Sequence, residues 1–232
     1  MMWNNPLATH TQWSSNISNK QAKQHVADQI AQRAKDGDVI GVGSGSTSFL
    51  ALQTIADYVK EKGYKVTAIP TSQEVMITCA TLGIPTTTLA TAKPDWAFDG
   101  ADEVDPNHHL IKGRGGAMFH EKLVIASSPE NYILVDQSKF VNRLGEKFPV
   151  PIEVDQRALH LVETKLSTFP VEKVHLRQAT AKDGPVITEA GNLILDAYFS
   201  SIDKNDEMRL AAIPGVIETG LFIEYNINVI SV

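Results

Sequence analysis

Apolar positions in the first part of the chain form the pattern of a helix, a strand and a second helix. Over residues 20–35 they recur at the spacing of one face of an α-helix. Residues 39–42 form a short apolar segment, typical of a strand buried in a parallel sheet. The glycine- and serine-rich residues 43–47 lead into a helical pattern over 49–62, so this stretch predicts a strand–loop–helix unit.

The same alternation continues to residue 135. Strands are predicted over 65–69, 86–89, 96–98 and 132–135, and helices over 72–82 and 117–126. Strands that alternate with helices favour right-handed crossovers. We therefore expect an α/β fold with a doubly wound, mostly parallel, Rossmann-like sheet.

The pattern changes near Gly145. Residues 148–154 contain prolines and predict an edge strand, because proline cannot donate a hydrogen bond to a neighbouring strand. Two further strands, 171–178 and 193–199, and a helix over 203–213 predict a small α+β, ferredoxin-like insert. The expected division is a Rossmann-like catalytic domain of residues 1–144 plus 217–232 and an insert subdomain of residues 145–216, with residues 220–232 returning to the main sheet.

Composition narrows the classes of function. The 232 residues are 43% hydrophobic, carry a net charge of −6 and include one cysteine, Cys79. An acidic chain is a poor partner for nucleic acid, which requires a basic surface. Residues 1–19 resemble neither a signal peptide nor a membrane span and form an N-terminal extension. We expect a soluble, cytoplasmic protein without nucleic acid or membrane partners and without a zinc site.

The loop Gly43-Ser44-Gly45-Ser46-Thr47 is a candidate phosphate site. Glycines admit a close approach to the backbone, and hydroxyls and helix N-terminal amides supply donors. The loop lacks the endings of a Walker A motif and of a dinucleotide-binding motif. An ordinary capped turn explains the same residues equally well.

Four carboxylates lie within residues 99–105, directly after a predicted strand. The carboxyl end of a parallel strand is where open sheets bind ligands, so these acids are candidate site residues. For Glu103 and Asp105 a solvated acidic turn is the favoured interpretation. Divalent-metal binding through carboxylates stays open at this point.

A basic, glycine-rich loop, residues 112–117, opens the helix that carries Glu121 and Lys122. A cation beside exposed backbone amides suits the stabilisation of a developing oxyanion. A surface ion pair is the alternative interpretation of Glu121 and Lys122. Lys139, after the strand 132–135, is either a phosphate or sugar contact or a solvated loop lysine.

Together these loops resemble the ribose-5-phosphate isomerases of the type A family. The resemblance runs in order from about residue 20 to residue 222. It rests on G-V-G-S-G-S-T (41–47), D-G-A-D-E-V-D (99–105), K-G-R-G-G-A (112–117), E-K (121–122), D-Q-S-K (136–139), F-P-V-P-I-E-V (148–154), G-N-L-I-L-D (191–196) and P-G-V-I-E-T-G-L-F (214–222). The second and third blocks are the most specific of the eight.

The resemblance implies interconversion of ribose 5-phosphate and ribulose 5-phosphate through an enediolate, with no metal or organic cofactor. Glu121 would be the base that moves the proton, Asp99 would assist ring opening, and Asp102 and Lys112 would position hydroxyls and stabilise the enediolate. The residues expected to bind the substrate are Ser44, Gly45, Ser46, Thr47, Asp99, Gly100, Ala101, Asp102, Lys112, Gly113, Arg114, Gly115, Lys139 and Lys23. The resemblance also implies a homodimer or homotetramer that forms partly through the insert.

Two other classes of function are compatible with this architecture. One is a sugar-phosphate-binding regulatory module, which would need no base and would normally accompany a DNA-binding segment. The other is an aminosugar-phosphate deaminase or acyl-CoA transferase of related fold. The D-G-A-D-E and K-G-x-G-G-A blocks favour the isomerase over both.

Overall fold

The computed structural model describes residue 13 and residues 16–232. Most of the expected N-terminal extension, residues 1–19, lies outside the described residues. The chain forms two compact units. Unit 1 comprises Met1–Gly100, Val124–Gln137 and Asn226–Val232, and unit 2 comprises Ala101–Leu123 and Ser138–Tyr225.

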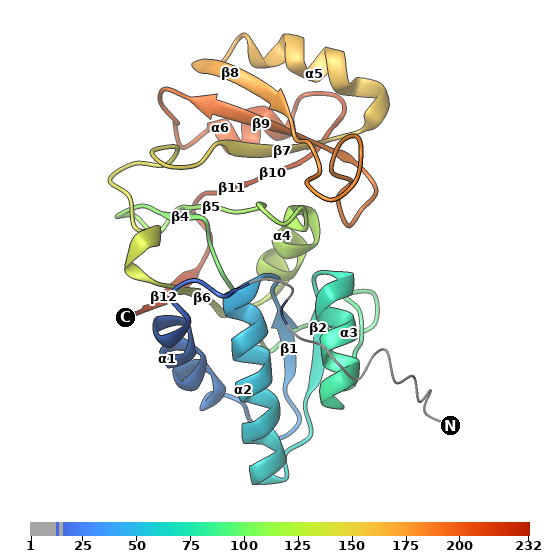
Figure 1. Ribbon diagram of the computed structural model, residues 1–232, viewed down its shortest axis with the longest axis vertical. Coiled ribbons are helices and arrows are strands. Elements are labelled where there is room, and N and C mark those ends of the chain that lie inside the picture. Colours follow the sequence, from blue (N-terminus) through green and yellow to red (C-terminus); the bar gives the residue numbers. More distant parts are fainter. Residues whose placement is uncertain (1–12, 14–15) are drawn as a thin grey trace. The chain divides into compact units, whose positions relative to one another are not determined.

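Unit 1 contains a five-stranded parallel sheet in the order β12-β6-β3-β1-β2 (Figure 1). Its strands are β1 (Val39–Val42), β2 (Thr67–Pro70), β3 (Trp96–Asp99), β6 (Asn131–Val135) and β12 (Ile227–Ser231). The chain runs from β1 outward to β2 and then crosses to β3 on the other side of β1. Strand order therefore reverses between β1 and β3, which is the position where open α/β sheets bind ligands.

Helices cover both faces of this sheet. They are α1 (Lys20–Ala31), α2 (Ser46–Lys62), α3 (Gln73–Leu82) and α4 (Met118–Ser127). Of α4, only the residues from Val124 onward belong to unit 1. Phe98 packs in the core that α1 and α2 share, whereas its neighbour Ala97 packs against Val124 of α4. Successive strand residues point to opposite faces, so the doubly wound prediction is confirmed.

One predicted strand of this unit is wrong. Residues 86–89 contribute only an isolated bridge between Thr86 and Ala68. The next residues form a turn, because the Thr88 carbonyl accepts hydrogen bonds from the amides of Thr91 and Ala92. Thr87 and Thr88 favoured a strand in the sequence, but their hydroxyls lie within hydrogen-bond distance of the Thr91 hydroxyl, which donates to the Thr88 carbonyl of this turn.

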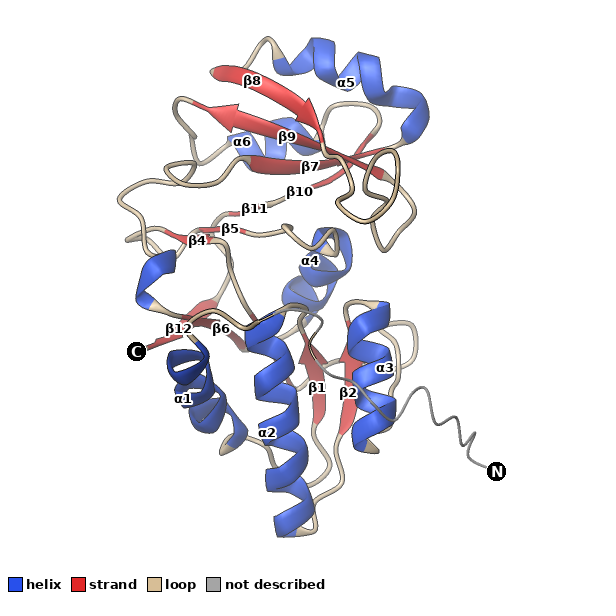
Figure 2. Ribbon diagram, viewed as in Figure 1, coloured by secondary structure: helices blue, strands red, loops and turns tan. Residues whose placement is uncertain are grey.

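Unit 2 contains a four-stranded antiparallel sheet in the order β10-β7-β9-β8 (Figure 2). Its elements in chain order are β7 (Val150–Val154), α5 (Leu159–Leu166), β8 (Val171–Leu176), β9 (Leu193–Phe199), α6 (Asp206–Ala211) and β10 (Val216–Thr219). The βαββαβ order and the strand arrangement are those of a ferredoxin-like fold. The predicted α+β insert is therefore present as a folded sheet with its own apolar core.

The prediction that residues 148–154 form an edge strand is wrong, because β7 lies between β9 and β10. Pro151 is tolerated because its missing N–H falls where β10 has ended. The Pro151 carbonyl still accepts from the Gly220 amide at 2.7 Å. A residue other than proline at position 151 would donate its amide to the Gly220 carbonyl. Here that carbonyl accepts from the Lys112 amide at 2.9 Å instead.

A three-stranded sheet, β11-β5-β4, completes unit 2. It joins β4 (Glu103–Val104), β5 (Leu110–Ile111) and β11 (Leu221–Phe222). Only Ile227–Ser231 of the predicted 220–232 segment returns to the main sheet. Unit 2 thus contains the whole of the predicted 145–216 insert and also takes in 101–123, 138–144 and 217–225.

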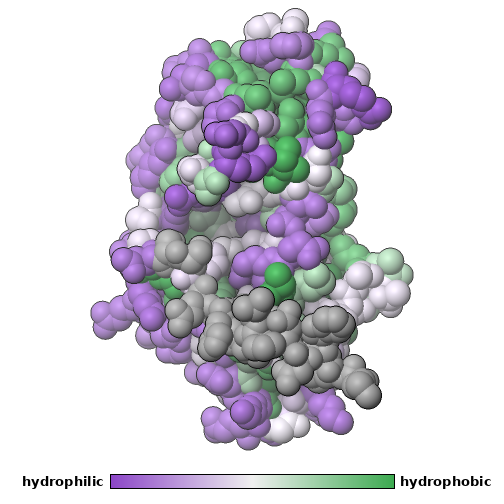
Figure 3. Space-filling model, turned by 45° about the vertical axis from the view of Figure 1, so that its right-hand side comes forward, coloured by the Kyte–Doolittle hydropathy of each residue, from purple (hydrophilic) through white to green (hydrophobic). Residues whose placement is uncertain are grey.

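Hydrophilic and hydrophobic residues are interspersed on the face drawn in Figure 3. Some large apolar side chains, such as Met208 and Ile187, are exposed. None of the described helices is both long and apolar enough to cross a membrane.

Candidate active site

The loop after β1 brings hydroxyls and a buried lysine together at the start of α2. Ser44 Oγ lies 2.8 Å from Thr71 Oγ1 and 2.9 Å from Ser72 Oγ. Lys23, which is 6% exposed, donates from Nζ to Ser46 Oγ at 2.9 Å. Hydroxyls, an ammonium and the first amides of a seventeen-residue helix are a suitable set for a small phosphate.

Asp99 ends β3, on the other side of the point where strand order reverses. It is 2% exposed, and its Oδ1 accepts from the Gly100 amide at 2.7 Å and from Ser48 Oγ at 3.4 Å. A Cβ on Gly43 would lie 2.0 Å from Asp99 Cγ, so only glycine fits beside this carboxyl group. The phosphate-type loop and Asp99 are thereby held against each other in unit 1.

Unit 2 places the candidate base beside the candidate cation. Lys112 Nζ lies 3.3 Å from Glu121 Oε2, and the two residues are 3% and 5% exposed. Burial removes most of the water that would otherwise screen this pair, so each charge acts strongly on the other and on a bound molecule. Glu121 lies in the first turn of α4, where the helix dipole also favours an anion.

The backbone of Lys112 is fixed by the neighbouring sheet. Its amide donates to the Gly220 carbonyl that Pro151 leaves without a partner. A Cβ on Gly220 would lie 2.3 Å from the Lys112 carbonyl oxygen, so any larger residue would push this segment away. Gly220 and Pro151 are thus part of the support of Lys112.

Asp102 and Arg114 line a cavity of about 430 Å³ within unit 2. Asp102 Oδ2 accepts from the Arg114 amide at 3.2 Å. The Arg114 side chain is exposed at this cavity, whereas the backbone at Gly113 is buried. Arg177 donates to the carbonyls of Gly113 and Arg114 at 2.8 and 2.9 Å.

Lys122 is buried, so the surface ion pair considered for Glu121 and Lys122 is wrong. Its ammonium donates to Glu207 at 2.7 Å, to Glu218 at 2.8 Å and to the Leu221 carbonyl at 2.7 Å. Adjacent residues of a helix point in directions about 100° apart. Lys122 therefore anchors α4 on one side while Glu121 faces Lys112 on another.

Glu103 is also buried, and the predicted solvated turn is wrong for it. Its carboxylate accepts from the amides of Gly145, Lys147 and Phe148 at 2.7, 2.5 and 2.7 Å. Asp105, 8% exposed, closes its own turn by accepting from the Asn107 and His109 amides. The four acids of residues 99–105 thus split into two structural residues and two, Asp99 and Asp102, that remain candidates for substrate contact.

Lys139 is half-buried at the end of a short 3-10 helix, η2 (Gln137–Lys139). Its ammonium lies 5.3 Å from the centre of the Phe148 ring. Lys147 donates to the carbonyls of Ser138 and Phe140, the residues on either side of Lys139. Lys139 is therefore a positioned lysine and not a freely solvated one.

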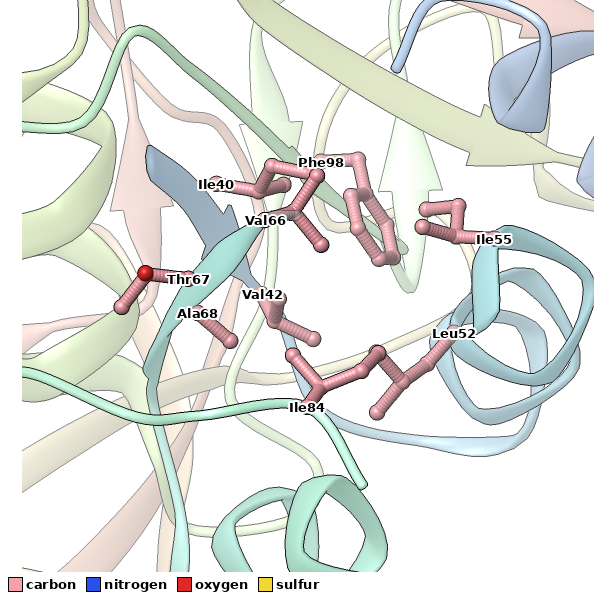
Figure 4. A pocket seen from close by; sticks show the side chains of 9 residues that line it. All are labelled: Ile40, Val42, Leu52, Ile55, Val66, Thr67, Ala68, Ile84 and Phe98. Atoms are coloured by element: carbon pink, nitrogen blue, oxygen red, sulfur yellow. The ribbon is translucent and has the colours of Figure 1, made fainter. Parts of the chain in front are cut away.

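Three other features are poor candidates for a site. The void in Figure 4 measures about 10 Å³ and lies between apolar side chains of the unit 1 core, so it is too small for a substrate. Burial raises the pKa of the Cys79 thiol to about 12, with Glu74 adding to the effect, so this thiol is a poor nucleophile. In the described part of the chain, no three His, Cys, Asp or Glu side chains come together to hold a metal ion.

Comparison with known proteins gives the family. A family model described as ribose 5-phosphate isomerase A (phosphoriboisomerase A) matches residues 67–232. A ribose-5-phosphate isomerase A from Methanothermobacter thermautotrophicus is 44% identical over 202 residues, which cover 86% of this chain and 88% of the relative. The chain belongs to the ribose 5-phosphate isomerase A family.

Solved structures of this family share the fold. The ribose 5-phosphate isomerase A of Methanocaldococcus jannaschii superposes with a TM-score of 0.88 at 40% identity, covering 91% of this chain and 95% of the other. A D-ribose-5-phosphate isomerase in complex with phospho-erythronic acid gives a TM-score of 0.87 at 38% identity, covering 92% and 95%. The resemblance drawn from eight sequence blocks is therefore confirmed at the level of the family.

Sequence reasoning missed several residues that support the ribose 5-phosphate isomerase A motifs. Asp136 is 5% exposed directly after β6, and the D-Q-S-K block gives no sign of this burial. Gly220 and Asp196 lie in two of the quoted blocks, but without contacts no role could be given to them. Arg177 lies outside all eight blocks, so nothing in the sequence pointed to it.

Proposed function

We propose that this protein interconverts D-ribose 5-phosphate and D-ribulose 5-phosphate through an enediolate. The observation that carries the proposal is the buried ion pair in which Lys112 Nζ lies 3.3 Å from Glu121 Oε2. It places a carboxylate beside a cation in a chain that belongs to the family of these isomerases. A relative in this family binds phospho-erythronic acid, a phosphorylated sugar acid. Membership of the family and this pair together favour proton transfer on a sugar phosphate.

Glu121 takes the proton from carbon 2 of the open-chain aldose and returns it to carbon 1, while a proton moves between the two oxygens. The electron pair left by the first transfer forms the enediolate, whose oxygen carries the developing negative charge. The Lys112 ammonium stabilises that charge more in the transition state than in the ground state. No electrons are lost or gained overall, so the reaction is an isomerisation.

The remaining candidate residues bind and orient the substrate in this proposal. Asp99 assists ring opening and Asp102 positions hydroxyl groups. The residues assigned to the substrate and its phosphate are Ser44, Gly45, Ser46, Thr47, Lys23, Lys139, Gly100, Ala101, Gly113, Arg114 and Gly115. The hydroxyl and lysine contacts around Ser44 and Ser46 support the phosphate role.

The pathway, location and assembly belong to the same proposal. Interconversion of these two pentose phosphates is a step of the non-oxidative pentose phosphate pathway, and a reducing cytoplasm agrees with a single buried thiol. A homodimer or homotetramer is expected from the family resemblance. Light scattering coupled to size-exclusion chromatography measures that mass directly.

The test follows the reaction in deuterated water by proton NMR. Proton transfer through Glu121 should exchange with solvent, so deuterium should enter the substrate carbons over many turnovers. Conversion with no deuterium uptake would indicate direct hydride transfer and contradict the proposed role.

A second test is chelation of metal ions. Activity should survive exhaustive chelation, because Lys112 supplies the positive charge that a metal ion would otherwise provide. Activity that is lost on chelation and restored by a divalent ion would assign the carboxylates to a metal.

A further inference from the structure

Arg177 is bound to a carboxylate on one side and to the catalytic loop on the other. Its Nε donates to Asp196 Oδ2 at 2.8 Å, and its Nη2 donates to Asp196 Oδ1. Its Nη1 donates to the carbonyls of Gly113 and Arg114. Both side chains of the ion pair are only 15% exposed, so the planar guanidinium is held in one orientation.

This contact determines where the next amide points. The carbonyl of one residue and the N–H of the following residue lie in one planar peptide group and point in opposite directions. Because Arg177 holds the Gly113 carbonyl, the Arg114 N–H points the other way, where it meets Asp102 Oδ2 at 3.2 Å. The Asp102 carboxylate is thereby linked to Asp196 through Arg177 and one peptide group.

The loop needs such a support. Gly113 has a φ of +101°, a conformation that glycine adopts without cost but that it also leaves easily. Gly115 and the Arg114 side chain are exposed, so they contribute little packing. Within the loop, the Gly116 amide donates to the Gly113 carbonyl at 3.1 Å. Arg177 adds a second, shorter and charge-assisted bond to that carbonyl, and it also holds the Arg114 carbonyl.

Charge argues against a direct role for Arg177 in binding the anionic substrate. Four charged residues line the cavity: Asp102, Arg114, Arg177 and Asp196. Asp196 neutralises Arg177, and the guanidinium already donates to four oxygen atoms. A guanidinium in this state orients its partners and adds little attraction for a phosphate.

We propose that Arg177, held by Asp196, is a positioning residue that sets the orientation of Asp102 through the peptide group between Gly113 and Arg114. The inference rests on the proposed function, in which Asp102 contacts the substrate. Arg177 itself does not touch the reacting atoms. Its removal should mainly reduce the rate of the chemical step, because small displacements of positioned groups lower rates more than affinity.

The first test compares kinetic constants of Arg177→Gln, Arg177→Lys and the wild type. We expect kcat to fall roughly ten- to a hundredfold in Arg177→Gln with KM changed by less than about threefold. Arg177→Lys should recover only part of the rate, since an ammonium cannot hold Asp196 through two bonds and both carbonyls together. Arg157→Lys is the matched control, because Arg157 forms a two-bond pair with Asp155 on the exposed surface.

The second test asks whether Arg177 acts through Asp102. On an Asp102→Asn background, Arg177→Gln should cost much less than it does alone, because the two residues form one linked unit. Penalties that multiply independently would overturn the inference. A fall in affinity with kcat unchanged would also overturn it, by making Arg177 a binding residue.

The third test does not depend on activity. Hydrogen exchange of the Arg114 amide, followed by NMR in the protein without substrate, should accelerate at least tenfold in Arg177→Gln and stay unchanged in Arg157→Lys. If exchange accelerates but neither the wild type nor any variant isomerises ribose 5-phosphate, the positioning role stands and the proposed function fails. If Arg177→Gln does not fold, Arg177→Lys and Asp196→Asn carry the same measurement, and unchanged exchange in both overturns the inference.

Discussion

In the proposed mechanism, Glu121 is the base that moves the proton. Glu121→Gln keeps the shape of the side chain and removes the base, so kcat should fall roughly a hundredfold to ten-thousandfold with KM nearly unchanged. Steady-state kinetics with ribose 5-phosphate measures both constants. Glu172→Gln, an exposed glutamate on β8, is the control and should leave them unchanged. Near-normal turnover in Glu121→Gln would remove the residue from the mechanism.

Lys139 should act through the phosphate of the substrate. Lys139→Ala should reduce kcat/KM for ribose 5-phosphate clearly more than for free ribose, because only the phosphorylated sugar has a contact to lose. Thr47→Ala should share part of this pattern. Free ribose should be a much poorer substrate of the wild type, since the phosphate helps to hold the reacting carbons.

The control for Lys139 is Lys173→Ala. Lys173 also lies over an aromatic ring, with its ammonium 4.3 Å from the centre of Tyr198, but on the exposed strand β8. It should change neither substrate's kinetics. Equal penalties of Lys139→Ala on the two sugars would show that Lys139 acts through structure and not through the phosphate.

At the scale of elements, Lys122 joins α4 to α6, β10 and β11. Lys122→Met leaves the partly buried carboxylates of Glu207 and Glu218 without their shared, buried cation, so the free energy of unfolding should fall by about 3–5 kcal/mol. Urea denaturation measures the change, and the exposed Lys165→Met on α5 should have almost no effect. Adding Glu207→Gln and Glu218→Gln to Lys122→Met should restore part of the loss. A loss under about 1 kcal/mol in the single variant would mean that this cluster is not an anchor.

Most elements could be predicted because their periodicity is set locally. The helices of unit 1 and the buried strands β1, β3 and β6 follow directly from apolar spacing and glycine-rich boundaries. The position of β7 could not be predicted, since Pro151 is compatible with a central strand only because the amide of Lys112, distant in sequence, serves the Gly220 carbonyl. Long-range hydrogen bonds of this kind leave no periodic signal.

Some candidate site residues could be predicted from local sequence, whereas the state of others depends on long-range contacts. Asp99, Lys112 and Glu121 stood out because charged groups next to glycines and strand ends are unusual. The burial of Glu103 could not be predicted, because its three amide donors come from residues 145–148 and any carboxylate in a polar turn looks solvated in sequence. The division of the chain into two units also depends on contacts between distant segments.

At the scale of the whole molecule, alkaline pH should weaken the fold through Tyr225. Burial, together with the charge of Glu207, raises the pKa of Tyr225 above that of an unfolded tyrosine. Its stabilising contribution is therefore complete below about pH 10 and is lost as the pH rises toward the folded-state pKa. The free energy of unfolding, measured by urea denaturation, should fall less steeply above about pH 10 in Tyr225→Phe than in the wild type. Parallel curves for the two proteins would show that Tyr225 does not contribute.

Because the Gly220 carbonyl accepts from the Lys112 amide, the support of Lys112 can form only after residue 220 has been synthesised. A nascent chain that has left the ribosome only as far as β9 already carries Lys112 and Glu121, yet it lacks Gly220, the carboxylates that anchor Lys122, and β12. In the proposed mechanism, catalytic competence therefore requires the segment that follows β9. Incomplete chains carry the candidate base and cation without the contacts that hold them in place.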